Sequence, residues 1–331
     1  MMQNQEIAII GGGSWATALA SIVSHNVKKF HWFIYEKEII DHIKTHKHNP
    51  QYISAIEFDP SKIVFHNHVK EAIDAANVII FVVPSAFIKP LMGKEDIDFS
   101  GKFFVNAVKG LIPDDNITVT QYFQEQFSIP FSRVGVVSGP CHAEEVALER
   151  LSYLTVGAEF EEDAKQVADL IRAPFVNTII SNDIYGIEYG SVLKNIYALG
   201  AGINHGLGYG DNFQAVYVSN AIREMERFLG KVFERERHLF HSVYLGDLLV
   251  TAYSQFSRNR TFGNMIGKGY SVQAAMIDLN MEAEGYYATK SIFEVNKKFK
   301  VKMPIAEAVY KILYEKCNAA AEVKALAQKL K

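Results

Sequence analysis

The chain has 331 residues, of which 49% are hydrophobic and 21% charged, and its formal net charge at pH 7 is −3. These values are typical of a globular protein large enough for two domains, and they give no electrostatic reason to bind nucleic acid or an anionic membrane. The two cysteines, Cys141 and Cys317, are far apart in sequence, so we expect neither a disulfide framework nor a metal centre. There is no signal-peptide pattern and no uncharged apolar run of about 18 residues, which predicts a cytoplasmic protein without a membrane span.

The first half of the chain alternates short apolar, β-branched runs with helical patterns. Strands are expected at Ile7–Ile10, Trp32–Tyr35, Ile63–Phe65, Val78–Val83, Phe103–Asn106, Val134–Val137, Leu154–Val156 and Val176–Ile180. Helices are expected at Ser14–His25, Lys37–Lys44, Val69–Ala75, Thr118–Gln126, Ala143–Leu148 and Glu161–Arg172. Continuous apolar strands separated by helices predict an α/β, doubly wound, mainly parallel sheet of the Rossmann type.

The strand signal stops after about Asn182, and helical periodicity takes over. Helices are expected at Ile184–His205, Asn212–Phe228, Leu245–Ala252, Thr261–Ile266, Val272–Asp278, Glu284–Lys297 and Ile305–Glu315, followed by an Ala/Lys-rich C-terminal helix. The change of pattern predicts a dinucleotide-binding domain over residues 1–181 and an all-helical substrate domain over residues 182–331.

A glycine turn connects the first strand to the first helix. The segment from Gly11 to Ala16 matches G-x-G-x-x-G/A, in which Gly11 permits the tight turn and Gly13 lets the backbone approach a pyrophosphate. The following helix would direct free N–H groups and its positive dipole end at the phosphates. Because strand, turn and helix agree, the turn predicts dinucleotide binding.

The second strand is followed by an acidic residue, Glu36, 20 residues beyond Ala16. A carboxylate there can accept hydrogen bonds from ribose hydroxyls and would repel a 2′-phosphate, which favours NAD over NADP. The neighbouring Lys37 leaves NADP open.

Polar segments follow the fifth and sixth strands, where an open parallel sheet forms its ligand crevice. Lys109 delivers a cation after the fifth strand, and Ser138–Glu145 follows the sixth. Lys109 is equally compatible with a surface lysine, and the Ser138-Gly139-Pro140 run with a plain turn. Cys141 near a helix start is a candidate nucleophile, although the adjacent His142 is poorly placed to activate it.

Lys194 is the only charged residue in the apolar helical stretch Tyr189–Ile203. A buried ammonium loses hydration, which lowers its pKa, whereas the alternative is a lysine whose stem reaches the surface. Its helix face carries only small neighbours, namely Gly190, Ser191, Ala198, Ala201 and Gly202. We interpret these small neighbours as space for another group to approach the lysine.

A Ser-Arg-Asn run at residues 257–259 precedes another predicted helix. Ser257 is a suitable N-cap, and a hydroxyl, a guanidinium, an amide and free backbone N–H groups together suit a phosphate. The alternative is a capped helix with a solvated arginine. Asp247 follows Gly246 directly before another predicted apolar helix, and the resemblance described in the next paragraph implies that it orients either Lys194 or a substrate hydroxyl.

The order of these motifs resembles that of the NAD(P)-dependent glycerol-3-phosphate dehydrogenase family over essentially the whole chain. The motifs are Gly11–Ala20, Lys109-Gly110-Leu111, Ser138-Gly139-Pro140, Leu193-Lys194-Asn195, Gly206–Asn212, Gly246-Asp247-Leu248, Ser257-Arg258-Asn259-Arg260 and Glu284-Gly285. The resemblance implies a homodimer that interconverts dihydroxyacetone phosphate and sn-glycerol 3-phosphate, the entry to glycerophospholipid synthesis. It implies dinucleotide contacts from Ser14, Trp15, Lys109, Ala143, Arg258 and Glu284. It implies substrate contacts from Lys109, Gly139, Cys141, Asp247, Ser257, Arg258 and Asn259, with Lys194 as the proton-transferring residue.

Three departures from the family pattern bear on these roles. Ala16 stands where a glycine is common, and Cys141-His142 replaces a small hydroxyl residue followed by an aromatic one, so Cys141 could contact substrate by side chain or by backbone. Glu36 resembles the NAD-using eukaryotic branch. Two competing functions stay open: a related β-hydroxyacid or ketopantoate-type dehydrogenase, which would not need the phosphate-suited Ser-Arg-Asn run, and a non-catalytic NAD-sensing protein on the same fold.

Overall fold

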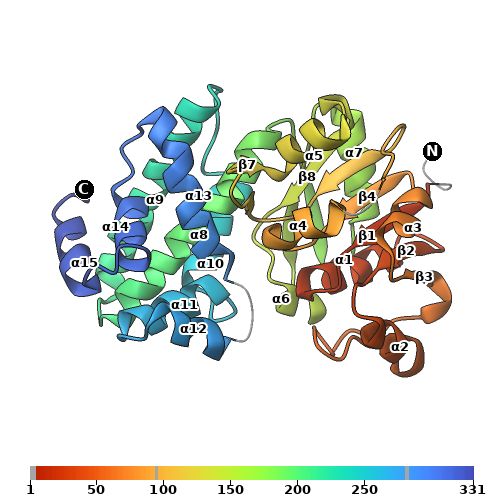
Figure 1. Ribbon diagram of the computed structural model, residues 1–331, viewed down its shortest axis with the longest axis horizontal. Helices are drawn as coiled ribbons and strands as arrows, with labels where there is room; N and C mark the ends of the chain where they lie inside the picture. Colours follow the sequence, from red (N-terminus) through yellow and green to blue (C-terminus); the bar gives the residue numbers. More distant parts are fainter. Residues whose placement is uncertain (1–4, 94–95, 280–282) are drawn as a thin grey trace. The chain divides into compact units, whose positions relative to one another are not determined.

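The computed structural model describes residues 5–93, 96–279 and 283–331. The chain folds into two compact units. The sheet unit comprises Met1–Val108 and Val119–Ile184, and the helical unit comprises Lys109–Thr118 and Tyr185–Lys331. Figure 1 shows the helices and strands of both units, coloured along the sequence.

The sheet unit is built on one eight-stranded sheet whose spatial order is β10-β9-β8-β5-β4-β1-β2-β3. Its strands are β1 (Ile7–Ile10), β2 (Phe30–Phe33), β3 (Ile63–His66), β4 (Val78–Phe81), β5 (Phe103–Asn106), β8 (Val134–Ser138), β9 (Ser152–Ala158) and β10 (Val176–Ser181). Neighbouring strands run parallel, with Ile9 opposite Ile80 for example, except that β8 and β9 are antiparallel. The predicted Rossmann-type, mainly parallel sheet is confirmed. Its carboxyl edge beyond β1 and β4 is where the glycine turn lies.

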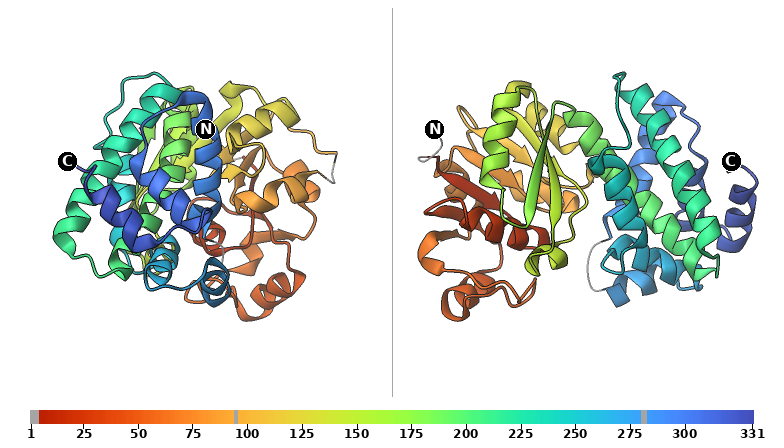
Figure 2. Two further views of the ribbon diagram at one scale, coloured as in Figure 1. Left: turned by 60° about the vertical axis from the view of Figure 1, so that its left-hand side comes forward. Right: turned by 180° about the vertical axis from the view of Figure 1, so that it is seen from behind.

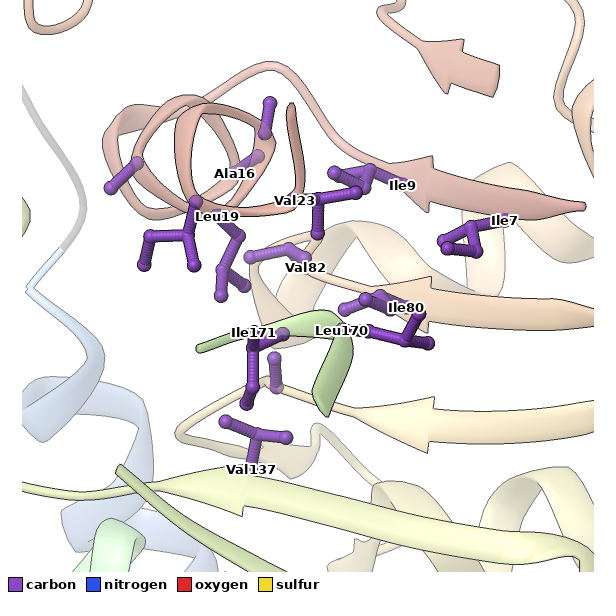
Figure 3. Packing of buried hydrophobic residues seen from close by; sticks show 14 of the residues in the cluster. Ile7, Ile9, Ala16, Leu19, Val23, Ile80, Val82, Val137, Leu170 and Ile171 are labelled. Atoms are coloured by element: carbon purple, nitrogen blue, oxygen red, sulfur yellow. The ribbon is translucent and has the colours of Figure 1, made fainter. Parts of the chain in front are cut away.

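Helices cover both faces of the sheet, which explains why its central strands are apolar throughout. The helices of this unit are α1 (Ser14–Ser24), α2 (Lys37–His46), α3 (Val69–Asp74), α4 (Ser85–Met92), α5 (Val119–Phe127), α6 (Ala143–Ala147) and α7 (Glu161–Leu170). On one face, Leu19 and Val23 of α1 pack with Ile9, Val82 and Ile171 (Figure 3). On the other, the Phe123 ring of α5 stacks on Phe104 with centroids 4.1 Å apart. Burial of each such side chain contributes about 1.5–3 kcal/mol, so α1 is held firmly behind the turn that precedes it.

The helical unit is arranged around one buried helix, α8 (Ile184–Gly206), in which every residue from Gly186 to Asn204 is buried. The other elements are the short antiparallel strands β6 (Leu111–Ile112) and β7 (Ile117–Thr118), a π-helical turn (Ser242–Gly246), and the helices α9 (Asp211–Val232), α10 (Asp247–Tyr253), α11 (Arg258–Gly267), α12 (Val272–Leu279), α13 (Glu284–Phe299), α14 (Pro304–Leu313) and α15 (Ala319–Ala327). Figure 2 shows the helical unit from two further sides.

Two helices of this unit approach backbone to backbone along a set of glycines that we call the glycine seam: Gly202 and Gly206 on α8 with Gly263 and Gly267 on α11. A Cβ atom on any of the four would overlap backbone atoms of the facing helix. Four-residue spacing puts each pair of glycines on one helix face, so the seam lets the helix axes approach more closely than side chains would permit.

A buried carboxylate replaces the missing N-cap of α14. Met303 provides no side-chain cap, but both carboxylate oxygens of the fully buried Glu224 on α9 accept hydrogen bonds, from the N–H groups of Ile305 and Ala306, at 2.9 Å each. These are two of the helix-start donors that have no partner within the helix. Glu224 therefore fastens α14 to α9.

The structure differs from the sequence-based expectations in several elements. β2 begins and ends two residues earlier than expected, because Ile34 and Tyr35 extend the apolar run beyond the paired strand. Helix α4 was not expected and contains Pro90 in its interior. The strands β6 and β7 were also not expected, and they group with the helical unit, which is therefore not purely helical. The division at residues 181 and 182 stays a prediction.

Candidate functional site

The glycine turn has the geometry that a pyrophosphate requires. Gly11 adopts φ +136°, and a Cβ atom there would lie 2.8 Å from the Val82 carbonyl oxygen, so only glycine fits. A Cβ atom on Gly13, the N-cap residue of α1, would meet nothing within 4 Å. No side chain caps α1, and an uncapped helix start of this kind suits an anion. The turn therefore fits a dinucleotide.

Three further residues of the sheet unit flank this turn. Glu36 is the N-cap residue of α2, and its carboxylate lies 3.7 Å from the position of a Cβ atom on Gly12. Ser14 is buried at the start of α1, and the next residue, Trp15, is half-buried. The structure thus brings together the predicted turn residues and the predicted ribose acceptor.

The segment after β8 is shaped by packing against β9. Gly139 adopts φ +151°, and a Cβ atom there would lie 2.5 Å from the Tyr153 carbonyl oxygen. Cys141 is 6% exposed and belongs to the hydrophobic core of the sheet unit. Ala143, also buried, begins α6. A close backbone contact thus accounts for Gly139 independently of any ligand.

Lys194 is buried in the helical unit, with 4% of its surface exposed, which excludes the alternative of a lysine reaching the surface. Its Nζ donates a hydrogen bond to Oδ1 of Asp247, a residue that is 1% exposed. The Thr251 hydroxyl donates to the Asp247 carbonyl oxygen at 2.6 Å. Asp247 thus contacts the lysine, the first of the two roles expected for it.

The charge state of Lys194 follows from these surroundings. Burial lowers its pKa to about 7, as the sequence predicts; the Asp247 carboxylate opposes this shift, and the Lys109 cation reinforces it. Near neutral pH both the ammonium and the amine are populated. A group in that state can donate a proton in one direction of a reaction and accept it in the other.

The small residues beside Lys194 do not all leave space for a ligand, and this expectation is wrong for two of them. Gly202 belongs to the glycine seam, and its side-chain space is filled by the Arg260 backbone of α11. Gly190 faces the Tyr244 ring, with a Cβ atom placed 3.1 Å from Cδ1. These residues are small because protein packs against them.

The Ser-Arg-Asn run lies at the start of α11. The Ser257 hydroxyl accepts a hydrogen bond from Arg260 N at 3.3 Å, which confirms the predicted N-cap, and the helix begins at Arg258 rather than at Thr261. Ser257 and Asn259 are buried, whereas Arg258 is exposed. The first turn of α11 thus carries all the groups proposed for phosphate.

Asn259 also fixes the start of α13, where Glu284 is the first residue. The Asn259 side-chain oxygen accepts from Gly285 N at 2.8 Å. A Cβ atom on Gly285 would lie 2.7 Å from the Asn195 carbonyl oxygen, so α8, α11 and α13 meet here. The Asn259 side-chain oxygen therefore has a structural role, whereas the NH₂ group of the same amide can donate to a ligand.

Asn195 has a role that the sequence did not suggest. Its amide donates to the Lys109 carbonyl oxygen at 2.9 Å, which holds the half-buried Lys109 against α8, next to Lys194. The only sequence signal is its place directly after Lys194 in the Leu-Lys-Asn run.

The described residues include no group of three or more His, Cys, Asp or Glu side chains suited to a metal ion, and no helix long and apolar enough to cross a membrane.

The Rossmann sheet with its open glycine turn, followed by a helical unit with a buried lysine–aspartate pair, defines a nicotinamide-dinucleotide-dependent dehydrogenase of the sheet-plus-helix class. The family models for NAD-dependent glycerol-3-phosphate dehydrogenase match residues 6–164 with the N-terminal part and residues 183–324 with the C-terminal part. The chain belongs to the NAD(P)-dependent glycerol-3-phosphate dehydrogenase family.

Individual relatives agree with this assignment. A Bacillus pumilus protein named glycerol-3-phosphate dehydrogenase (NAD(P)+) is 34% identical over 315 residues, which cover 94% of this chain and 90% of the relative. The crystal structure of glycerol-3-phosphate dehydrogenase from Coxiella burnetii superposes with a TM-score of 0.88 at 26% identity, covering 98% of both chains. The structure of 2-dehydropantoate 2-reductase from Methylococcus capsulatus has a TM-score of 0.60 at 10% identity over 98% of this chain and 97% of its own. That last likeness shows a shared fold alone.

Proposed function

We propose that this protein interconverts dihydroxyacetone phosphate and sn-glycerol 3-phosphate with NAD(P)H and supplies glycerol 3-phosphate for glycerophospholipid synthesis. Family membership supports the reaction. The buried Lys194–Asp247 pair is the observation that supports an enzymatically active protein. The proposal includes the predicted domains, residues 1–181 for the dinucleotide and 182–331 for the substrate. It also includes a cytoplasmic homodimer, which size-exclusion chromatography with light scattering would test.

The sheet unit is assigned to the dinucleotide. The N–H groups at the start of α1 would bind the pyrophosphate, and Gly13 leaves room for it. Glu36 would accept hydrogen bonds from the ribose hydroxyls and favour NAD. Further contacts are assigned to Gly11, Ser14, Trp15 and Ala143 in this unit and to Lys109, Arg258 and Glu284 in the helical unit. When bound, the reduced cofactor supplies the hydride.

The helical unit is assigned to the proton and the phosphate. During reduction, negative charge develops on the C2 oxygen of the substrate; the Lys194 ammonium stabilises this charge and donates the proton. In oxidation the neutral amine accepts it. Asp247 holds the amine in place, while Ser257, Arg258 and Asn259 bind the phosphate and convert remote binding energy into orientation. Gly139 and Cys141 are assigned to substrate as well, and the burial of Cys141 in the core favours a backbone contact over a side-chain one.

The deciding experiment follows NADH and NADPH oxidation with dihydroxyacetone phosphate and, in parallel, with unphosphorylated dihydroxyacetone. We expect kcat/KM to be higher with the phosphate ester by roughly 10³-fold, because charge-assisted hydrogen bonds to the phosphate are lost with the alcohol. Equal rates with both substrates, or turnover only with a β-hydroxyacid or ketopantoate, would refute the substrate assignment. NADH binding without any turnover would instead favour a sensing role.

A further inference from the structure

The glycine turn is held from behind by side chains that the dinucleotide motif does not include. Each of its successive carbonyl oxygens accepts a hydrogen bond from a different side chain. The bonds join Trp32 Nε1 to Gly11 O at 2.8 Å, Asn49 Nδ2 to Gly12 O at 3.1 Å and Thr17 Oγ1 to Gly13 O at 3.0 Å. The donors come from a strand, a loop and a helix, so three separate elements fix one turn.

Asn49, in the loop after α2, connects this arrangement. It is fully buried, and its NH₂ group donates both to Gly12 O and to Thr17 Oγ1, the latter at 3.0 Å. Its side-chain oxygen accepts from the N–H groups of Gln51 and Tyr52 at 3.1 Å each. The hydrogen-bonding capacity of the amide is fully used, so its orientation is fixed and Thr17 receives the hydrogen bond that aims its own hydroxyl at Gly13.

The carbonyl bonds determine where the N–H groups point. In a planar trans peptide the C=O of one residue and the N–H of the next point in opposite directions. Fixing the carbonyls of Gly11, Gly12 and Gly13 therefore fixes the N–H groups of Gly12, Gly13 and Ser14 on the opposite side of the turn. Within residues 5–93, 96–279 and 283–331, no acceptor bonds any of these N–H groups, and Gly13 faces open space.

We propose that Trp32, Asn49 and Thr17 are positioning residues for dinucleotide binding, which act by holding the turn carbonyls so that successive backbone N–H groups converge on the pyrophosphate. The inference rests on the proposed dinucleotide site and adds to it residues outside the glycine motif. Glycine backbones rotate freely, and a peptide rotated the wrong way would present a carbonyl oxygen to the phosphates. Each side-chain bond opposes one such rotation, and at Gly13 it acts together with the Thr17 N–H, which donates to the same carbonyl oxygen at 2.9 Å.

The experiment measures dissociation constants for NADH and ADP-ribose, which contain the pyrophosphate, and for adenosine, which lacks it. The variants are Trp32→Phe, Thr17→Val and Asn49→Leu, each of which removes the donor while keeping most of the side-chain volume. We expect each to weaken NADH and ADP-ribose binding by roughly 10-fold and adenosine binding by less than about 2-fold. The KM for NADH should rise while kcat at saturating NADH changes little, and Thr17→Ser should restore binding.

Matched controls separate positioning from general damage. Phe65→Leu changes the aromatic packing against Trp32 without touching a turn carbonyl, and Gln51→Ala alters an exposed neighbour of Asn49; both should bind ADP-ribose like the wild type. Equal weakening of ADP-ribose and adenosine binding, or unchanged ADP-ribose binding in Trp32→Phe and Thr17→Val, would overturn the inference. Wild-type protein that binds ADP-ribose but does not reduce dihydroxyacetone phosphate would refute the proposed reaction and leave this inference intact.

Discussion

Lys194 and Glu224 are two buried ionisable groups of the helical unit that are satisfied in different ways. Lys194 is paired with a second buried ionisable side chain, Asp247, and its pKa is lowered to about 7, mainly by burial. Glu224 is paired with backbone N–H groups of α14, and burial raises its pKa to about 8 against the effect of those hydrogen bonds. Both groups have pKa values close to neutral.

The comparison teaches that a shifted pKa alone does not identify a catalytic residue. The hydrogen bonds to the Glu224 carboxylate come from the start of α14, and the exposed Arg227 guanidinium of its own helix lies 3.9 Å away. Loss of Glu224 should therefore affect folding. Lys194 has a side-chain partner and a second cation nearby, so its loss should affect chemistry. The predictions below test this distinction.

The largest effect is expected for Lys194→Met. Removing the proposed proton donor should lower kcat by roughly 10²–10⁴-fold. The dissociation constant for NADH should stay within about 3-fold of the wild type, because the dinucleotide is assigned mainly to the sheet unit. The measurements are steady-state kinetics as a function of pH and NADH fluorescence titration. The wild-type profile should have a limb near pH 7, falling with rising pH for reduction, and the variant should lack it. Near-normal turnover in the variant would remove Lys194 from the mechanism.

The next effect is expected for Glu224→Leu. This change leaves two buried N–H groups without acceptors, which should lower the free energy of unfolding by about 2–4 kcal/mol, while kcat of the folded enzyme is unchanged. Urea unfolding gives the stability. Glu226→Leu on the same helix is the matched control, since Glu226 is exposed and should cost little. A large loss of kcat together with unchanged stability would reverse the roles we assign.

The smallest effect is a difference in how the two groups couple stability to pH. The raised pKa of Glu224 means that its contribution to stability is fully present below about pH 4.5 and is lost as the pH rises through about 8. The lowered pKa of Lys194 means that its contribution is present above about pH 10.5 and is lost as the pH falls through about 7. The free energy of unfolding of the wild type minus that of Glu224→Leu should thus fall with rising pH. The free energy of unfolding of the wild type minus that of Lys194→Met should rise with rising pH.

Each slope is at most about 1.4 kcal/mol per pH unit for one titrating group. Urea unfolding at intervals between pH 5 and pH 10 resolves slopes of this size. Two difference curves with the same sign of slope would show that one of the two pKa shifts runs in the other direction.

The fold was largely predictable because its signals are local. Apolar runs such as Ile7–Ile10 and the helical periodicity after Asn182 specify strands and helices without knowledge of their neighbours. Helix α4 was not predicted because Pro90 lies inside it. The strands β6 and β7 are too short to show an alternation of apolar and polar residues. These errors come from weak local signals.

The candidate site was predictable in composition and less so in arrangement. The sequence pointed to Lys194 and Asp247, but a small residue such as Gly202 gives no indication of whether a ligand or another helix fills the space beside it. Asn49 was missed for a related reason, since its bond to Gly12 spans 37 positions of the chain. A long-range contact of a single polar side chain produces no periodic pattern in the sequence from which it could be predicted.

The glycine seam also has a mechanical consequence. Because the backbones of α8 and α11 interlock at Gly202 and Gly263, neither helix can slide or rotate past the other without first separating. Lys194 lies on one of these helices, and Ser257 caps the other. The interlocked glycines therefore fix the spacing between the Lys194 amine and the start of α11, and this spacing limits the length of any molecule that contacts both.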